Sequence, residues 1–221
     1  PTVLAAIGPG LEYLIQYPYG CTEQTVSSFL PDLLVARLLR TVDRHTASEM
    51  RRAIPREQLQ ALPEMVRAGV SRLRSLQSEG WAWWGADEPD PWLTAYATMA
   101  LGYAARDGYE IPRAMAASAV DSCRAQAQRA SPDTAAFLSY AFALVDAKPI
   151  PRRDVSTMSA PGLACVILED RCRGYRTPAG HAAYERLRRL AVSSGSLGHW
   201  QAGREVLYGC LTSTALALQA T

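Results

Sequence analysis

One stretch of the chain decides the fold: Leu76-Gln-Ser-Glu-Gly-Trp81, followed after a loop by Trp92-Leu-Thr-Ala-Tyr-Ala-Thr-Met-Ala-Leu101. A second copy, Ser196-Leu-Gly-His-Trp200, leads into Thr212-Ser-Thr-Ala-Leu-Ala-Leu-Gln219. In each copy a Gly/Trp turn precedes a helix that contains a Thr-Ala pair, 13 or 14 residues further on. A weaker copy, Asp133-Thr-Ala135, lacks the tryptophan turn. Repeated turn–helix units predict helical hairpins that stack side by side, as in an α-solenoid or an α/α toroid.

Apolar residues recur at helical spacing along most of the chain, and no convincing alternation typical of β-strands is present. The first predicted helix starts at Cys21 and carries an apolar stripe as far as Val42. Further helices are predicted over residues 58–76, 93–105, 114–127, 133–144, 162–168, 181–192 and 211–219. We therefore expect an all-α protein, built as an α/α toroid of the terpenoid-cyclase-like kind.

The composition is that of a single globular domain. The 221 residues have a mass of 24.1 kDa, 48% are hydrophobic and 20% are charged. This balance excludes a disordered chain. A net charge of +2 without a basic block argues against a nucleic-acid partner. No apolar run reaches the roughly 18 residues that span a bilayer. Since the chain starts and stops abruptly in folded-looking sequence, we expect residues 1–221 to be one domain of a larger multidomain protein.

Five cysteines occur, and their spacing fits no zinc module. We therefore expect neither a metal nor a cofactor. Cys165 and Cys172 are seven residues apart, which on a continuous helix is about 10.5 Å and too far for a disulfide. The sequence leaves that pairing open if the helix ends between them, near Asp170-Arg171.

The residues that carry chemistry lie in Tyr17-Pro-Tyr-Gly-Cys-Thr-Glu-Gln24. Pro18 and Gly20 interrupt the incoming chain, so that Cys21 and Gln24 are three residues apart in the first helical turn, where side chains are neighbours. If the Cys21 sulfur attacks the Gln24 side-chain carbonyl and ammonia leaves, an internal thioester forms. The helix dipole favours the thiolate that this chemistry needs. The alternative is an ordinary helix start with a small buried Cys21 and a solvated Gln24.

The full string Pro-Tyr-Gly-Cys-x-Glu-Gln resembles the thioester signature of the alpha-2-macroglobulin and complement family. Three further features carry the resemblance: Pro31 within the first helix, Pro91-Trp-Leu-Thr-Ala-Tyr96, and the turn Gly198-His-Trp200. Thr25, directly after the glutamine, makes the motif look more like the bacterial alpha-2-macroglobulin branch.

This resemblance implies a thioester domain in a broad-spectrum endopeptidase inhibitor that traps proteases covalently. The thioester would acylate a lysine amine of the attacking protease in a single turnover, which is not enzymatic catalysis. It further implies a bacterial defence protein that is exported to the periplasm or the cell exterior and anchored to a membrane. The expected partners are proteases and the other domains of the parent chain. The family domain closes with another helical hairpin, so the toroid is expected to be truncated at the C-terminus.

Some relatives pass the acyl group to a histidine before a hydroxyl attacks. The segment that would hold that histidine contains none here, and we expect His45, His181 and His199 to have surface or capping roles. The sequence therefore predicts direct attack by amines. Lys148 is the only lysine of the chain, which would limit self-acylation.

Aromatic residues near the motif are candidates for shielding the thioester from water: Tyr17, Tyr19, Trp83 and Trp84. Trp92 is expected in the core. Without the rest of the parent protein, we expect the thioester to be hydrolysed or never to form.

Two other functions remain open. A covalent adhesin or opsonin would use the same thioester to tag surfaces. A terpene cyclase-like enzyme would need an acidic cluster, for which Asp87-Glu-Pro-Asp90 is the only candidate, and its proline favours a solvated turn. Glu23, inside the motif, is interpreted either as a supporting general base or as a negative charge that stabilises the helix N-terminus.

Overall fold

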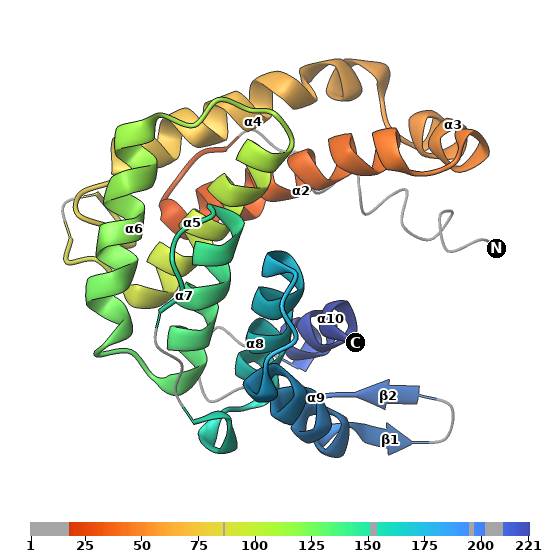
Figure 1. The fold of residues 1–221 in the computed structure, drawn as a ribbon. Helices are drawn as coiled ribbons and strands as arrows, with labels where there is room; N and C mark the ends of the chain where they lie inside the picture. The colour runs from red at the N-terminus through yellow and green to blue at the C-terminus, as the bar shows by residue number, and fades with distance from the viewer. Residues whose placement is uncertain (1–17, 86, 151–153, 195–196, 202–209) are drawn as a thin grey trace. The chain divides into compact units, whose positions relative to one another are not determined.

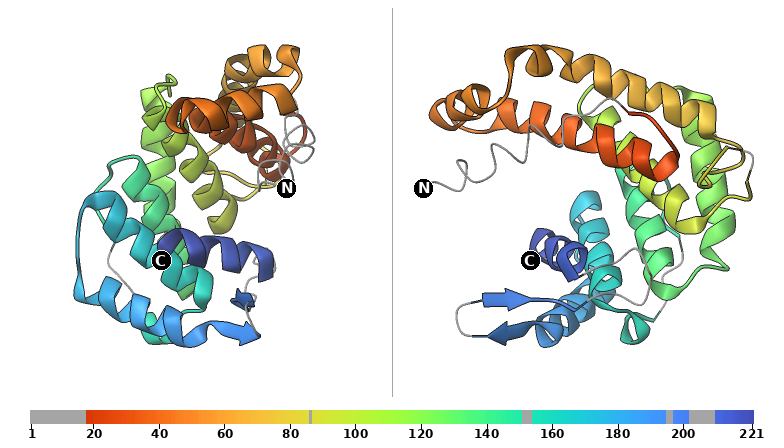
Figure 2. Two further views of the ribbon diagram at one scale, coloured as in Figure 1. Left: turned by 90° about the vertical axis from the view of Figure 1, so that its right-hand side faces the viewer. Right: turned by 180° about the vertical axis from the view of Figure 1, so that it is seen from behind.

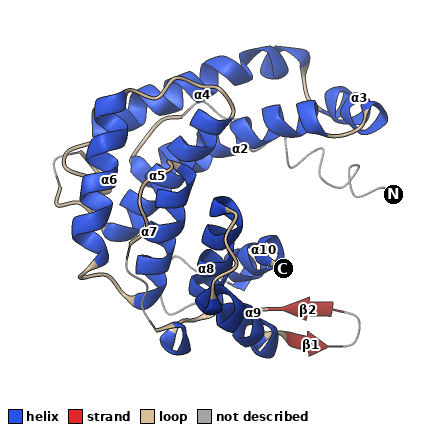
Figure 3. Ribbon diagram, in the orientation of Figure 1, coloured by secondary structure: helices blue, strands red, loops and turns tan. Residues whose placement is uncertain are grey.

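The computed structural model describes residues 18–85, 87–150, 154–194, 197–201 and 210–221. Helices dominate this part of the chain (Figure 3), which confirms the prediction of an all-α fold. The chain divides into two compact units, residues 1–117 and 118–221, each described here by itself. Among the described residues, no helix is both long enough and apolar enough to cross a membrane.

The first unit is built around helix α2, which lies beside two other helices of the same unit. Its helices are α2 (Thr22–Thr41), α3 (Arg44–Ala53), α4 (Arg56–Leu76), α5 (Pro91–Arg106) and the first residues of α6 (Arg113–Ala127). Helix α2 packs against α4 and α5 (Figure 1). At Gly69 of α4, an added Cβ atom would lie 2.4 Å from the Phe29 ring of α2. The missing side chain therefore leaves room for the phenyl ring against α4.

The sequence analysis did not predict helix α3. Only two of its residues, Ala47 and Met50, are buried, which is too few to show the apolar spacing of a helix. Its start is nevertheless encoded: the Asp43 carboxylate accepts hydrogen bonds from the backbone N–H groups of His45 and Thr46. Such an N-cap satisfies donors that the first helical turn leaves unpaired.

The tryptophan turn before α5 is locked to that helix by a threonine. The Trp81 indole is fully buried and donates to the Leu73 carbonyl at 2.9 Å. The Trp81 backbone N–H donates to Thr94 Oγ1 at 3.0 Å, and the same hydroxyl donates to the Trp81 carbonyl at 3.2 Å. One threonine thus satisfies both backbone groups of the buried tryptophan.

The second unit repeats this lock. Its further elements are α7 (Pro132–Leu144), the 3-10 helix η1 (Val155–Thr157), α8 (Ala160–Arg173), α9 (Pro178–Leu190), β1 (Val192–Ser194), β2 (Leu197–His199) and α10 (Cys210–Ala220). The Trp200 N–H donates to Thr214 Oγ1 at 3.0 Å, and the Trp200 indole donates to the Leu187 carbonyl at 2.8 Å. The repeat seen in the sequence is therefore a repeat of hydrogen-bonding geometry.

The core of the second unit is the helix pair α7 and α8. Every residue of α7 after its first proline is buried, and α8 packs against α7, α9 and α10. Strands β1 and β2 form an antiparallel hairpin after α9 (Figure 2), with Ser193 opposite Gly198. The sequence analysis missed this hairpin because three-residue strands are too short to show alternation.

The structure excludes one possibility that the sequence left open and corrects one expectation. Helix α8 runs without interruption to Arg173 and ends at Gly174 in a left-handed conformation, so Cys165 and Cys172 lie on one helix and both thiols are free. Trp92, expected in the core, is only half-buried, and it stacks on the Tyr96 ring with 4.9 Å between the centroids. Its place in the first turn of α5 keeps it at the edge of the unit.

The threonine lock gives a stability prediction. Thr94→Val removes the hydroxyl and leaves the buried Trp81 N–H without its acceptor, while the Trp81 carbonyl keeps the hydrogen bond from the Asp90 N–H. The orphaned N–H costs about 1–3 kcal/mol. We expect chemical denaturation to show a loss of unfolding free energy in this range. Thr41→Val, at the exposed end of α2, should change it by less than about 0.5 kcal/mol. Equal effects of the two substitutions would contradict the lock.

A buried carboxyl on α2 gives a pH prediction. Both Asp32 oxygens are buried without a hydrogen-bond partner among the described residues, and burial raises the pKa of this carboxyl from 3.8 to about 8. The folded state therefore binds a proton more tightly than the unfolded state, and stability falls as pH rises from about 4 towards 8. Denaturation at pH 5 and pH 8 should show a smaller pH-dependent loss for Asp32→Asn than for the wild type. The exposed helix cap Asp43, changed to Asn, should leave that loss unchanged; a wild-type-like slope for Asp32→Asn would contradict the assignment.

Candidate functional site

The start of helix α2 brings Cys21 and Gln24 together in a capping box. Cys21 is the N-cap, with extended backbone angles, and its side chain faces the backbone N–H of Gln24. In return, the Gln24 side-chain oxygen accepts a hydrogen bond from the Cys21 N–H at 3.2 Å. The Gln24 side chain therefore folds back over the first turn, towards the residue that carries the thiol.

Gly20 makes this fold-back possible. Its φ of +96° is a conformation that other residues rarely adopt. A Cβ atom on this residue would lie 2.1 Å from Gln24 Oε1 and 3.0 Å from Gln24 Cδ. The Gly20 carbonyl accepts hydrogen bonds from the Arg72 guanidinium at 2.9 and 3.3 Å, which tie the turn to α4.

The tryptophan turn lies directly against the start of α2. The Thr22 N–H donates to the Trp83 carbonyl at 3.1 Å. The Cys21 carbonyl accepts from the Thr25 N–H at 2.9 Å and from the Thr25 hydroxyl at 2.8 Å. The backbone around the thiol is therefore fixed from α2 itself and from the loop that precedes α5.

Cys21 and Gln24 differ in their exposure. Cys21 is 5% exposed, whereas Gln24 is on the surface. Of the aromatic residues proposed as a shield, Tyr19 is 73%, Trp83 44% and Trp84 55% exposed. Trp83 and Trp84 belong to the turn that contacts the helix start, and Tyr19 lies two residues before Cys21. Tyr17 lies outside the described residues.

A hydrogen-bonded set beside Gln24 was not expected from the sequence. The Ser27 hydroxyl donates to Glu23 Oε1 at 2.6 Å, and Ser27 Oγ lies 3.2 Å from the Tyr96 hydroxyl of α5. The i,i+4 spacing of Glu23 and Ser27 is visible in the sequence. The contact with Tyr96 depends on the packing of α5 against α2, which no local pattern reveals.

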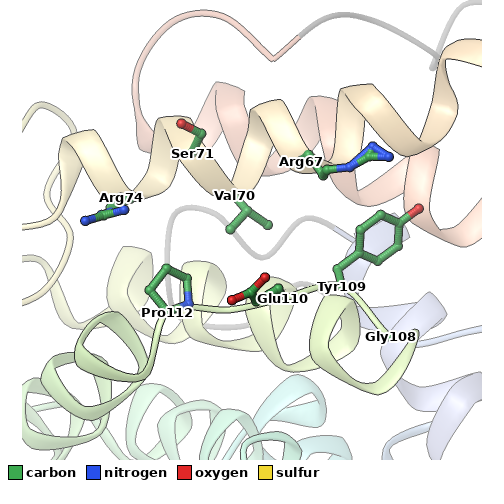
Figure 4. Close-up of a pocket in the computed structure, with 8 residues that line it drawn as sticks. All are labelled: Arg67, Val70, Ser71, Arg74, Gly108, Tyr109, Glu110 and Pro112. Atoms are coloured by element: carbon green, nitrogen blue, oxygen red, sulfur yellow. The ribbon is translucent and has the colours of Figure 1, made fainter.

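Grooves open along α4 in the described part of the first unit. One, of about 500 Å³, is lined by residues 18–20 of the motif and by Ala68, Ser71, Arg72 and Ser75 of α4. The other, of about 580 Å³, lies between α4 and the loop before α6 (Figure 4). There Arg67 and Arg74 project from α4 opposite Tyr109 and Glu110. Burial raises the pKa of Tyr109, against the effect of Arg40 and Arg67. Neither groove is lined by Cys21 or Gln24.

The other candidate residues belong to other elements of the chain. His45, His181 and His199 are exposed, as the sequence analysis expected. The acidic stretch 87–90 is a loop, and Asp90 caps α5 by accepting from the Leu93 N–H at 2.8 Å. Within the described ranges, no three His, Cys, Asp or Glu side chains group as metal ligands.

Comparison with known proteins decides the family. Residues 2–123, just over half of the chain, match the family described as the A-macroglobulin TED domain. The chain belongs to this family. Its motif and fold agree with the resemblance to the bacterial alpha-2-macroglobulin branch on which the sequence analysis relied.

Two curated relatives of this TED domain are bacterial alpha-2-macroglobulins. The protein of Thermotoga maritima is 26% identical over 125 residues, which are 56% of this chain and 7% of that protein. The protein of Escherichia coli K12 is 35% identical over 107 residues, which are 46% of this chain and 6% of that protein. The matched part is thus a small fraction of the length of either relative.

Solved structures share the fold of the TED domain. The native conformation of E. coli alpha-2-macroglobulin matches with a TM-score of 0.62 and 18% identity, over 87% of this chain and 13% of that one. A Salmonella alpha-2-macroglobulin reacted with methylamine matches with a TM-score of 0.57 and 21% identity, over 89% of this chain and 13% of that one.

The fold-back of Gln24 gives a prediction. Gly20→Ala places a methyl group where the Gln24 side-chain oxygen lies and strains the backbone, so Gln24 turns outward and no longer meets Cys21. Mass spectrometry of the intact protein should show that any bond between the two side chains is lost. Gly108→Ala is the matched control, since Gly108 has a similar φ of +89° and nothing within 4 Å of its added Cβ. A Gly20→Ala protein that retains the bond would refute the role of this glycine.

Proposed function

We propose that Cys21 and Gln24 form an internal thioester and that this TED domain is the acylating domain of a protease-trapping bacterial alpha-2-macroglobulin. The observation that carries the proposal is the reciprocal capping box. It folds the Gln24 amide back over the turn that holds the Cys21 thiol. Gly20, which has no Cβ, leaves room for this bent side chain.

The chemistry balances within these two residues. The Cys21 sulfur attacks Gln24 Cδ, a C–S bond forms, the C–N bond of the amide breaks, and the nitrogen leaves as ammonia. The Cys21 sulfur is the nucleophile in this step and the leaving group in the next one.

The stored acyl group is released by an amine. The amine nitrogen bonds to Gln24 Cδ, the C–S bond breaks, and the Cys21 thiol is regenerated, so each domain acts once. This is single-turnover acyl transfer and not enzymatic catalysis. Gln24 lies at the surface, where a lysine of a trapped protease can arrive. Lys148 is the only lysine of the chain, and arginine guanidinium groups stay charged and unreactive.

The exposed aromatic side chains fit a surface that another domain covers until activation. Tyr19 lies two residues before Cys21, Trp83 and Trp84 belong to the turn that contacts Thr22, and all three side chains are exposed to solvent. A covering domain would keep water from the thioester, and its displacement would admit the amine. On this account, another domain of the parent chain contacts this surface before activation. The parent protein is exported and meets proteases outside the cytoplasm.

Methylamine incorporation tests the proposal. In the intact parent protein, peptide mass spectrometry should show methylamine attached to Gln24 and a new free thiol at Cys21. Cys21→Ala should abolish incorporation completely, because no acyl group is then activated. Cys172→Ala, which removes the half-exposed thiol of α8, should leave incorporation at the wild-type level. Equal labelling of Gln24 with and without Cys21 would overturn the proposal.

A further inference from the structure

We propose, on the basis of the thioester proposed above, that the Cys21 N–H stabilises the negative charge that develops on the Gln24 side-chain oxygen during acyl transfer. Arg72 strengthens this donor through the peptide group that joins Gly20 to Cys21. One backbone peptide group and one arginine thereby take part in the reaction, in addition to capping helix α2.

The peptide group between Gly20 and Cys21 is hydrogen-bonded at both ends. Its N–H donates to Gln24 Oε1, 3.2 Å away. Because a backbone N–H can only donate, the atom that it meets is the oxygen of the Gln24 amide and not the nitrogen. Its carbonyl accepts from Arg72 Nη2 at 2.9 Å and from Arg72 Nε at 3.3 Å. An unbroken path of hydrogen bonds therefore runs from the guanidinium to the oxygen on the reacting carbon.

The Arg72 guanidinium acts on this peptide group as an unpaired cation. Arginine stays protonated in proteins, and Arg72 forms no ion pair with any described residue. The groove that Arg72 lines beside the motif has no acidic side chain in its wall. A cation on a carbonyl polarises the amide, which makes the N–H at the other end a stronger donor. Arg72 is therefore a positioning residue that acts through Gly20.

A donor at this oxygen matters because the oxygen carries the developing charge. It stays on Gln24 Cδ when sulfur replaces nitrogen, so the amide and the thioester share it. When a neutral amine adds to Cδ, the C=O electron pair moves to Oε1 and the amine nitrogen becomes positively charged. The nitrogen then loses one proton to water. The C=O bond re-forms, the C–S bond breaks, and its electron pair leaves on Cys21 Sγ.

The capping box places one backbone donor at each of the two atoms that become negative. The Gln24 N–H faces the Cys21 side chain, where the thiolate forms. The Cys21 N–H meets the oxygen at 3.2 Å, which is the long end of the range for such bonds. A hydrogen bond between charged partners shortens to about 2.7–2.9 Å. The donor therefore stabilises the charged adduct more than the ground state, which is the condition for a faster reaction.

The test removes the charge of Arg72 in the intact parent protein. Loss of a whole oxyanion donor lowers a rate about 10²–10³-fold, and Arg72 only strengthens one, so Arg72→Gln should slow methylamine-dependent release of Cys21 about 10-fold. Spontaneous hydrolysis of the thioester should slow by the same factor, because water attack passes through the same charged oxygen. Arg74→Gln removes an exposed charge from the same helix and should leave both rates unchanged. Rates are compared per thioester formed, as measured by the loss of ammonia from the protein mass.

The vibration of the thioester carbonyl separates this role from simple support of the turn. A stronger hydrogen bond to a C=O group lowers its stretching frequency. In protein labelled with ¹³C at the glutamine side-chain carbonyl, Arg72→Gln should raise the thioester frequency, and Arg74→Gln should not. A turn that merely loosens would admit water, so that hydrolysis would become faster instead of slower.

Arg72→Lys keeps the test decisive if Arg72→Gln folds without closing the thioester. It restores the positive charge, so the protein mass should again show the loss of ammonia. That loss persists even when the introduced lysine is itself acylated. A folded Arg72→Lys protein that keeps its ammonia would overturn the role of the charge.

The results separate the two proposals. A wild-type parent protein with an unmodified Gln24 and no methylamine uptake refutes the thioester itself. A reactive wild type, with rates and carbonyl frequency that Arg72→Gln leaves unchanged, refutes the role of Arg72 and of the polarised N–H alone. Faster hydrolysis in Arg72→Gln would show that Arg72 only supports the turn, and would overturn that role as well.

Discussion

The hydrogen bond from the Cys21 N–H to the Gln24 side-chain oxygen is the interaction on which the site depends. It satisfies a backbone donor that the first turn of α2 would otherwise leave unpaired. The same bond brings the side-chain amide of Gln24 back over the N-cap residue. Gly20 permits the arrangement because it has no Cβ, and Arg72 holds the Gly20 carbonyl from α4. Helix capping and the proposed chemistry thus require the same geometry.

The rest of the first unit keeps that helix start in place. The buried Trp81 and Thr94 fix the loop whose Trp83 carbonyl receives the Thr22 N–H. Helix α5, which begins after this loop, also carries Tyr96 to Ser27. One turn-and-helix unit therefore contacts α2 at both Thr22 and Ser27. The second unit contains the same Trp–Thr hydrogen bond at Trp200 and Thr214, but no Cys-x-x-Gln motif accompanies it. The Trp–Thr lock therefore belongs to the repeated fold and does not depend on the motif.

The sequence predicted those parts of the structure that depend on local spacing. The Trp-to-Thr distance predicted a repeat because the lock closes over 13 or 14 residues, and the Cys21–Gln24 spacing predicted neighbours because a helix fixes it. Helix α3 and the short hairpin lacked an apolar pattern long enough to detect. The sequence left the pairing of Cys165 with Cys172 open because the continuity of α8 depends on its burial against α7. Likewise, Tyr96 reaches Ser27 only through tertiary packing, which no single sequence displays.

The state of residue 24 is the most direct test of the central claim. Tandem mass spectrometry of the peptide that spans Cys21 and Gln24, taken from the intact parent protein without added nucleophile, reports it in one measurement. The account predicts a Cys21–Gln24 pair lighter by one ammonia, or glutamate at position 24 where water has already opened the thioester. An unmodified glutamine amide beside a free Cys21 thiol in every molecule would contradict it.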